Sequence, residues 1–267
     1  HKITFKKFAK SILGKEKYDL FIKSVGFSDF EDEDVIDTIY DYGFDDCVSG
    51  NDLFSINWNE FLEAFYNELK TSIKLNSNIN HITRTNDGKF IIKNTKYDTV
   101  FIASGSNTVY NLTKNNIYKS IKPQSFTRLY VKLNKPIGNY NRMIYTEKPF
   151  QKVIEMNKDK CIYMISYSDN KIADKWNNIK KSDFNNYIEK NILNIFGIEV
   201  KVLKNKLIYW KNGTHYFRPL KKEFNNRKQF LSIIQNPEKN MYVVGEAFSI
   251  NQGWCEGAIQ SVDDILN

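Results

Sequence analysis

Apolar residues in the N-terminal part of the chain recur with the period of an α-helix. The spacing predicts helical structure over residues 4–50, with Gly26 ending the first helix. An acidic block from Asp29 to Asp46 lies inside this region. Because carboxylates in a first helical turn interact favourably with the helix dipole, we expect this block to begin a solvated helix and not to bind metal.

A second helix is predicted where Asn57 and Glu60 form a capping-box pattern. Its apolar face consists of Phe61, Leu62, Phe65 and Leu69. After Lys74 the apolar period becomes that of β-strands. Two short runs, 79–83 and 89–93, flank an Asp-Gly turn at residues 87–88 and predict a hairpin.

Further strands and helices alternate through the rest of the chain. Strands are expected over residues 99–103, 126–133, 142–146, 153–156, 161–167, 200–209 and 242–244. Ser182 and Gly197 bracket one predicted helix, and another begins at about Cys255. This mixture predicts α/β and α+β parts that interleave, without an obvious linker between domains.

Composition narrows the class of protein. With 41% hydrophobic and 15% aromatic residues, the chain can bury a sizeable core. No run approaches the roughly 18 apolar residues that span a bilayer, and no signal peptide pattern opens the sequence. Cys47, Cys161 and Cys255 are odd in number and far apart, which argues against a disulfide framework and a CxxC zinc site. We therefore expect a cytoplasmic protein without a metal site.

The net charge of +8 invites comparison with nucleic-acid-binding proteins. The basic residues are nearly all lysines, spread along the chain, and the arginines are Arg84, Arg128, Arg142, Arg218 and Arg227. Proteins that read phosphates and bases favour arginine and clustered basic stripes. We therefore do not expect a nucleic-acid partner.

The most informative segment runs from Tyr242 to Ser261. A short apolar strand delivers Gly245 and Glu246 at its carboxyl end, where open α/β sheets bind ligands. A polar loop then leads through Gly253 to a helix whose first N–H groups can face an electron-rich ligand. Its small residues, Gly257 and Ala258, allow close packing.

This segment resembles the C-terminal FAD signature of the flavin-containing amine oxidase superfamily, which includes monoamine, polyamine and protoporphyrinogen oxidases. The matching pattern is Gly-Glu, a loop, Gly-aromatic-x-Glu-Gly-Ala, and a serine in the helix. The resemblance implies that Glu246 binds the ribityl–phosphate region of FAD. It also implies that the helix start at Trp254 and Cys255, together with Gly245, Gly253, Gly257 and Ala258, forms the rest of this cofactor segment.

Two earlier segments fit the same family in the same order. The stretch around Ile79 and the strand ending in Ala103-Ser-Gly105 resemble the middle block of the FAD domain. The resemblance implies that Ile79 contacts adenine through its backbone and that Ala103 and Gly105 lie under the cofactor. It divides the chain into residues 1–56 (helical part of the substrate domain), 57–110 (FAD-domain segment), 111–235 (substrate domain) and 236–267 (C-terminal FAD-domain segment).

One part of the family pattern is missing. The βαβ unit with G-x-G-x-x-G, which holds the pyrophosphate, does not occur in this sequence, so the Rossmann-like FAD domain is incomplete. The sequence starts at His1 and not at methionine, and we expect a preceding segment to supply this unit. A degenerate relative that no longer holds flavin is the alternative.

The resemblance also suggests substrate-binding residues. Arg128 falls where many relatives have a lysine near the flavin, with Lys132 expected on the same face. If Arg128 faces the pocket it indicates an acidic group on the substrate, and otherwise it forms a surface or inter-strand salt bridge. Trp254 matches an aromatic wall beside the flavin, and His215 or Tyr216 is a candidate for the opposite wall. His215 could alternatively be only a hydrogen-bonding residue in a loop.

The implied activity is that of a non-covalent FAD-dependent oxidoreductase. In the family, a C–H next to nitrogen loses hydride to flavin N5, and dioxygen reoxidises the flavin. The substrate would be a small amine or an amino-acid-like molecule. Two alternatives remain open: a non-catalytic descendant that serves as a structural or interaction protein, and a flavoprotein that does not use dioxygen. Cys255 is expected to be a small buried residue at its helix start.

Overall fold

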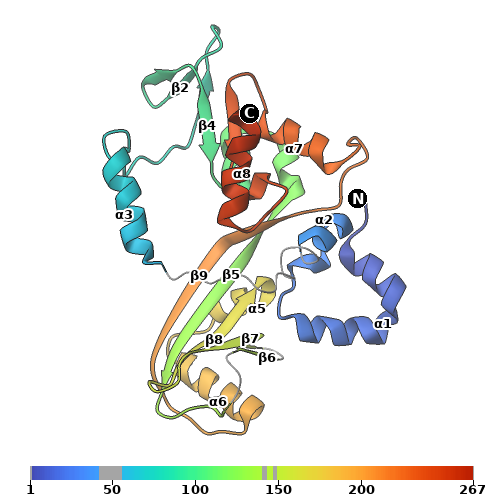
Figure 1. Cartoon of the computed structure of the whole chain (residues 1–267), viewed down its shortest axis with the longest axis vertical. Coiled ribbons are helices and arrows are strands. Elements are labelled where there is room, and N and C mark those ends of the chain that lie inside the picture. Colours follow the sequence, from blue (N-terminus) through green and yellow to red (C-terminus); the bar gives the residue numbers. More distant parts are fainter. Residues whose placement is uncertain (1, 42–55, 140–142, 147–148, 267) are drawn as a thin grey trace.

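The computed structural model describes residues 2–41, 56–139, 143–146 and 149–266. Figure 1 shows an elongated molecule in which a long two-stranded ribbon, β5 and β9, joins an upper part to a lower part. The helices are α1 (Phe5–Val25), α2 (Val35–Tyr40), α3 (Trp58–Leu69), α4 (Ser106–Thr113), α5 (Asn170–Asn177), α6 (Phe184–Phe196), α7 (Arg227–Gln235) and α8 (Cys255–Leu266). The strands are β1 (Thr83–Arg84), β2 (Phe90–Ile92), β3 (Thr95–Tyr97), β4 (Val100–Ala103), β5 (Ile121–Leu133), β6 (Met143–Tyr145), β7 (Lys152–Asn157), β8 (Ile162–Asp169), β9 (Val202–Phe217) and β10 (Met241–Val244).

The lower part is built on a five-stranded antiparallel sheet in the order β6-β7-β8-β5-β9. Along β5, Leu129, Val131 and Leu133 are buried against the lower core, and the residues between them point to the other face. This alternation confirms that Arg128 and Lys132 share a face. The core-facing side is covered by α5 and α6, which bring Trp176 and other apolar side chains to the same cluster.

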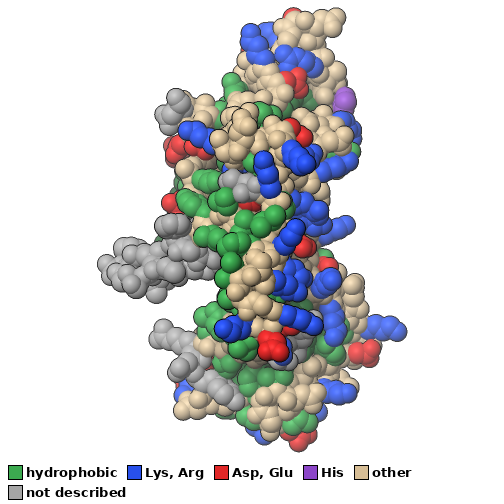
Figure 2. Space-filling model, turned by 90° about the vertical axis from the view of Figure 1, so that its right-hand side faces the viewer, with side chains coloured by type: hydrophobic (Ala, Val, Ile, Leu, Met, Phe, Trp, Pro, Cys, Tyr) green, Lys and Arg blue, Asp and Glu red, His purple; other side chains and the backbone are tan. Residues whose placement is uncertain are grey.

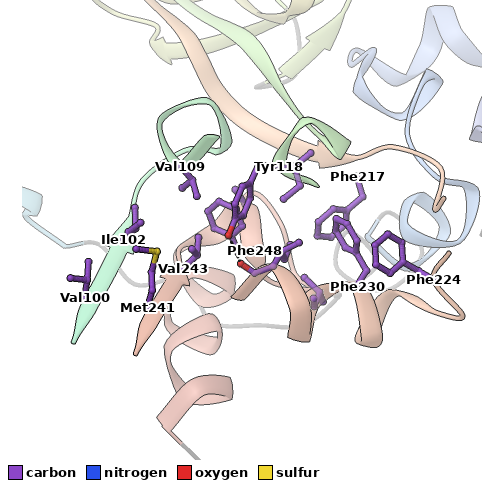
Figure 3. Close-up of a cluster of buried hydrophobic side chains, with 14 of the residues drawn as sticks. Val100, Ile102, Val109, Tyr118, Phe217, Phe224, Phe230, Met241, Val243 and Phe248 are labelled. Carbon is purple, nitrogen blue, oxygen red and sulfur yellow. Dashed lines mark hydrogen bonds between the residues drawn. The ribbon is translucent and has the colours of Figure 1, made fainter. Parts of the chain in front are cut away.

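The upper part contains a two-stranded parallel sheet in which β4 pairs with β10. Figure 3 shows Ile102, Val243 and Met241 of this sheet facing the aromatic rings of Tyr118 and Phe248. The same core also takes Phe217, Phe224 and Phe230, from the end of β9 and from α7. The combination of a parallel pair with helices and a separate antiparallel sheet is the mixed architecture that the sequence predicts.

The N-terminal helices differ from expectation in two ways. Gly26 ends α1 in the left-handed conformation, as predicted, but Gly14 interrupts this helix with a φ of 74°. The acidic block is not a solvated helix start, because Glu33, Asp34 and Asp37 are buried. Asp34 caps α2 by accepting the N–H of Ile36. Residues 42–50 of the predicted helix, with Cys47, lie outside the described residues.

Local signals elsewhere were mostly correct. Asn57 caps α3 where the sequence predicts the helix start, by accepting the N–H of Asn59. Glu60 accepts from the side-chain amide of Asn57, a side-chain contact in place of the backbone N–H that a capping box uses. α3 has no buried residue. The hairpin forms, with β1 shorter than expected. Asp183, not Ser182, precedes α6, and Gly197 ends that helix in the left-handed conformation. The expected strand 200–209 continues to Phe217, so His215 lies in β9 and not in a loop.

The face shown in Figure 2 bears many basic side chains. On the face shown in Figure 2, lysines and arginines are spread along the long axis, with carboxylates between them. Within the described residues, no helix combines the length and the apolarity that crossing a bilayer requires.

Candidate functional site

The carboxyl ends of β4 and β10 meet at one edge of the parallel sheet, because Ala103 lies opposite Val244. Gly105 follows β4 and caps α4, and Gly245 follows β10. Gly245 has a φ of 121° and a ψ of 167°, a region that is essentially restricted to glycine. This turn directs the next residue, Glu246, across the end of the sheet.

Both carboxylate oxygens of Glu246 have protein partners. Oε2 accepts the backbone N–H of Gly253 at 3.0 Å, and Oε1 lies 2.5 Å from Nδ1 of His215. The Glu246 side chain is still 27% exposed, whereas that of His215 is 5% exposed. Glu246 therefore joins the loop before α8 to strand β9 and keeps one side open to solvent.

His215 connects Glu246 with the start of α4. Its Nε2 accepts the N–H of Ser106 at 3.3 Å, which assigns the ring proton to Nδ1 and makes Nδ1–H the donor to Glu246. A Cβ at Gly105 would lie only 3.0 Å from this Nε2, so the glycine leaves room for the ring. His215 thus holds the ends of β4 and β10 together by hydrogen bonds.

Replacing His215 with alanine should lower the free energy of unfolding by about 1–3 kcal/mol, because the buried N–H of Ser106 loses its acceptor and Glu246 loses a donor. Chemical denaturation followed by circular dichroism would measure the change. The matched control is His81→Ala, since His81 is exposed. Equal stability of the two variants would contradict this role.

The start of α8 combines open and closely packed positions. Trp254 is 65% exposed and Cys255 is also exposed, so the expectation of a buried cysteine is wrong. Gly257 is buried, and a Cβ there would lie 1.7 Å from the backbone oxygen of Asn251. Ser261 accepts the N–H of Gly245 at 2.8 Å and anchors α8 to the end of β10. Ala258 takes part in the first helical turn, where its N–H donates to Trp254.

Ile79 lies away from this edge, in a pocket of about 300 Å³ beside the β1–β2 hairpin. Asn78, Asn80 and His81 contribute polar groups to the same pocket. Backbone and amide groups of this kind can satisfy the nitrogen atoms of a purine edge. Ile79 thus lines a hollow at this hairpin, and its contact with adenine stays a prediction.

The remaining candidates lie on β5 and β9. Adjacent strand residues point to opposite faces, so His215 and Tyr216 cannot both line one pocket. Tyr216 is buried, and the contacts of His215 fit the hydrogen-bonding role better than an exposed wall. Arg128 is half-buried over the ring of Tyr167, and no ion pair to it occurs in the part of the chain that the structure describes. The inter-strand salt bridge considered above is thus not formed among these residues.

The chain's own residues fit the C-terminal part of a flavin site. No atom lies within 4 Å of a Cβ built at Gly245 or Gly253, so the backbone at both positions can be approached closely. The exposed first turn of α8 offers N–H groups and a positive dipole end beside them. Among the described residues, no cluster of histidine, cysteine and carboxylate side chains suits a metal ion.

Sequence reasoning missed two contributors to this site. The first is the backbone N–H of Ser106, which donates to His215. The only sequence feature at this position is a small residue after Gly105, and it does not predict such a contact. Gln252 donates to the backbone oxygen of Ala247 and, with Asn251, supports the loop under α8. Buried amides in a loop between two glycines could have indicated a fixed conformation there.

Comparison with known proteins gives a fold and one distant relative. No family model matches the sequence. The uncharacterized protein R188 of Acanthamoeba polyphaga mimivirus is 27% identical over 124 residues, which cover 39% of this chain and 24% of that protein. The chain thus matches about a quarter of the length of this curated relative.

Two solved structures share the architecture. Cyclohexylamine oxidase from Brevibacterium oxydans matches 100% of this chain and 68% of its own, with a TM-score of 0.72 and 8% identity. A putative protoporphyrinogen oxidase from Exiguobacterium matches 76% of this chain and 50% of its own, with a TM-score of 0.57 and 9% identity. The chain is therefore structurally similar, over its whole length, to members of the flavin amine oxidase superfamily.

Proposed function

We propose that this protein is an FAD-dependent oxidoreductase of the amine oxidase type that binds its flavin non-covalently. The observation that carries the proposal is the position of Glu246, which follows Gly245 at the end of β10 and contacts Gly253 before α8. A partly exposed carboxylate beside a helix start and two open glycines is suited to the polar chain and ring edge of a flavin.

Each part of the site has a separate task in this proposal. Glu246 would bind the ribityl region, the first turn of α8 would face the pyrimidine edge, and the pocket at Ile79 would take the adenine. Trp254 would shield one side of the substrate from water. When bound, FAD supplies the hydride acceptor and the reaction with dioxygen.

The pyrophosphate contacts require groups beyond those of this sequence, which has no G-x-G-x-x-G. The parallel sheet contains only β4 and β10 in the described part of the chain. Parallel sheets are normally larger and covered on both faces, yet Phe101 is largely exposed here. We propose that a further βαβ unit, outside these 267 residues, completes both the sheet and the flavin site.

The direct test is the absorption spectrum of the full-length encoded protein, purified without added cofactor. Oxidised flavin bands that persist through gel filtration and are released by denaturation support the proposal. Absence of flavin, together with no binding of added FAD, contradicts it. Peroxide release over a panel of amines and amino acids then separates an oxidase from a flavoprotein that does not use dioxygen.

Replacing Glu246 with alanine should lower the affinity for FAD about tenfold or more, since the proposed hydrogen bond between this carboxylate and the ribityl chain would be lost. Flavin content per chain and an FAD titration followed by fluorescence would measure this. Asp264→Ala is the matched control, because Asp264 is an exposed carboxylate on the same helix but lies near its C-terminal end, away from the first turn. Unchanged flavin content in Glu246→Ala would remove Glu246 from the cofactor site.

A non-catalytic structural protein is the second candidate. It is favoured by the contacts of Glu246, whose two oxygens are already engaged by His215 and Gly253. In that case Glu246 would only fasten the loop before α8 to β9. The spectrum distinguishes the candidates, because this second function predicts a colourless protein whose Glu246→Ala variant loses stability.

A further inference from the structure

We propose that the sheet face around Arg128 binds the carboxylate of a ligand with an aromatic body. This face is the side of the five-stranded sheet that points away from the lower core. Phe126, Arg128 and Tyr130 all point to it from β5 and are half-buried. Antiparallel partners share a face, so Tyr167 of β8 and Ile208 of β9 stand on either side of Arg128.

The hydrogen-bonding capacity of the Arg128 guanidinium is not fully used by the residues that the structure describes. Its Nε is buried and has no hydrogen-bond partner among the described residues. The guanidinium carbon lies 5.1 Å from the centre of the Tyr167 ring. Arginine remains protonated at all relevant pH values, and its planar fork pairs with a carboxylate through two parallel hydrogen bonds. A half-buried guanidinium stacked on a ring is therefore a ready partner for a carboxylate.

A second basic side chain, that of Lys152, lies near Arg128. The ammonium of Lys152 lies 5.2 Å from the centre of the same Tyr167 ring, so two cations flank one aromatic side chain. Asp169 stands opposite Phe126, but its oxygens accept the backbone N–H and the hydroxyl of Ser28. The carboxylate of Asp169 is thus directed to Ser28 in the loop after α1, and no ion pair between Asp169 and Arg128 occurs among the described residues.

Aromatic rings continue from Arg128 along the ribbon. Phe126 contacts Tyr167 edge-on with ring centres 4.9 Å apart, and the ring of Trp210 lies 6.5 Å from Phe126. Trp210 is 41% exposed, which leaves a ring surface for a ligand. A ligand whose carboxylate is held at Arg128 can therefore place an aromatic body on Phe126 and Trp210.

The direction of these rings leads to the candidate flavin site. Pro123, five residues before Arg128 on β5, lies opposite His215. At about 3.3 Å per residue, this corresponds to roughly 16 Å along the strand. The proposal thus deepens the proposed function, on which its substrate role rests: the substrate would be an amine with an aromatic group and a carboxylate at the end remote from Glu246.

Binding itself can be tested without flavin. The probes are phenylacetate and its neutral analogue phenylacetamide, titrated into the full-length protein by calorimetry and by Trp fluorescence. Wild type should bind phenylacetate about tenfold or more tightly than phenylacetamide, since only the former pairs with the guanidinium. Arg128→Gln should remove this preference, and Lys132→Gln, which loses a charge on the same strand face, should retain it.

Further variants keep the test decisive. Arg128→Lys keeps the positive charge but loses the planar guanidinium that makes two parallel hydrogen bonds, so it should reduce the preference for phenylacetate over phenylacetamide. This variant provides the test if Arg128→Gln does not fold. Trp210→Leu should weaken both probes equally. The proposal is overturned if wild type binds neither probe, if it binds both equally, or if a folded Arg128 variant keeps the full preference. Flavin content of the same samples tests the proposed function separately, because phenylacetate binding does not require the cofactor.

Discussion

Replacing Arg227 with methionine should lower the free energy of unfolding at neutral pH by about 3–5 kcal/mol, the cost of leaving a buried charge without its partner. Arg227 is 3% exposed, and its Nε and terminal nitrogen both donate to the carboxylate of Asp37, the shorter contact being 2.6 Å. The guanidinium also stacks on Phe217 and Phe230. This pair fastens α2 to α7, and urea denaturation would measure its contribution.

The double variant Asp37→Leu, Arg227→Met should recover most of that loss. Burial raises the pKa of Asp37 to about 6, although the guanidinium of Arg227 opposes the rise. The cost of removing water from the carboxylate therefore exceeds its attraction to Arg227, and an apolar pair of similar volume avoids that cost. If the double variant is as unstable as Arg227→Met alone, the attraction between Asp37 and Arg227 outweighs the cost of removing water from them, which would contradict this expectation.

The raised pKa of Asp37 also determines how the stability of the folded protein depends on pH. A carboxyl group whose pKa is about 6 in the folded protein and about 3.9 when unfolded binds more protons in the folded state between these values. Its contribution to stability is therefore complete below about pH 4 and is lost as the pH rises through 6. The loss in free energy of unfolding caused by Arg227→Met should be smaller at pH 5 than at pH 8. At pH 5 the Asp37 left without its partner can take up a proton and is then no longer a buried charge.

Substituting leucine for Gly257 should destabilise the C-terminal segment by about 3 kcal/mol or more and lower the occupancy of the proposed flavin site. A side chain there would overlap the backbone oxygen of Asn251, which is fixed by the polar loop and cannot rotate away. The loop would have to move, and Gly253 with its contact to Glu246 would move with it.

Thermal unfolding and flavin content per chain measure the two effects of this change. Gly257→Ala should show the same effects to a smaller degree, since its Cβ already meets the oxygen at 1.7 Å. Ile259→Ala is the control, because Ile259 lies on the same helix and is largely exposed. A stable, flavin-bearing Gly257→Leu variant would mean that the loop is free to adopt another course.

Local sequence signals predicted the ends of helices better than they predicted the tertiary contacts of those helices. Gly26 and Gly197 end helices because a left-handed residue needs no tertiary partner to be favourable. The burial of Asp37 was not foreseen, because its partner Arg227 is remote in sequence and nothing in either local pattern connects them. An ion pair between two single residues far apart in sequence produces no periodic pattern, so the sequence alone does not reveal it.

The candidate site shows the same division. The strand, glycine and helix order after Tyr242 could be recognised from one continuous segment, and the structure forms it as expected. The contact between His215 and Glu246 depends on the length of β9, which the sequence pattern ended at residue 209. The apolar face of α3 was predicted from the sequence, and in the structure this face is exposed. Periodicity alone does not show whether another element packs against an apolar helix face.

The pairing of Val100 with Met241 constrains how the molecule is made. During synthesis β4 emerges before β10, so it lacks its neighbouring strand until residues 104–240 have been made. Bringing such distant segments together has a large loop-closure cost, which slows folding. The nascent upper core, with Val100 and Ile102, therefore stays uncovered until β10 has been made, and efficient production should depend on chaperones that shield it.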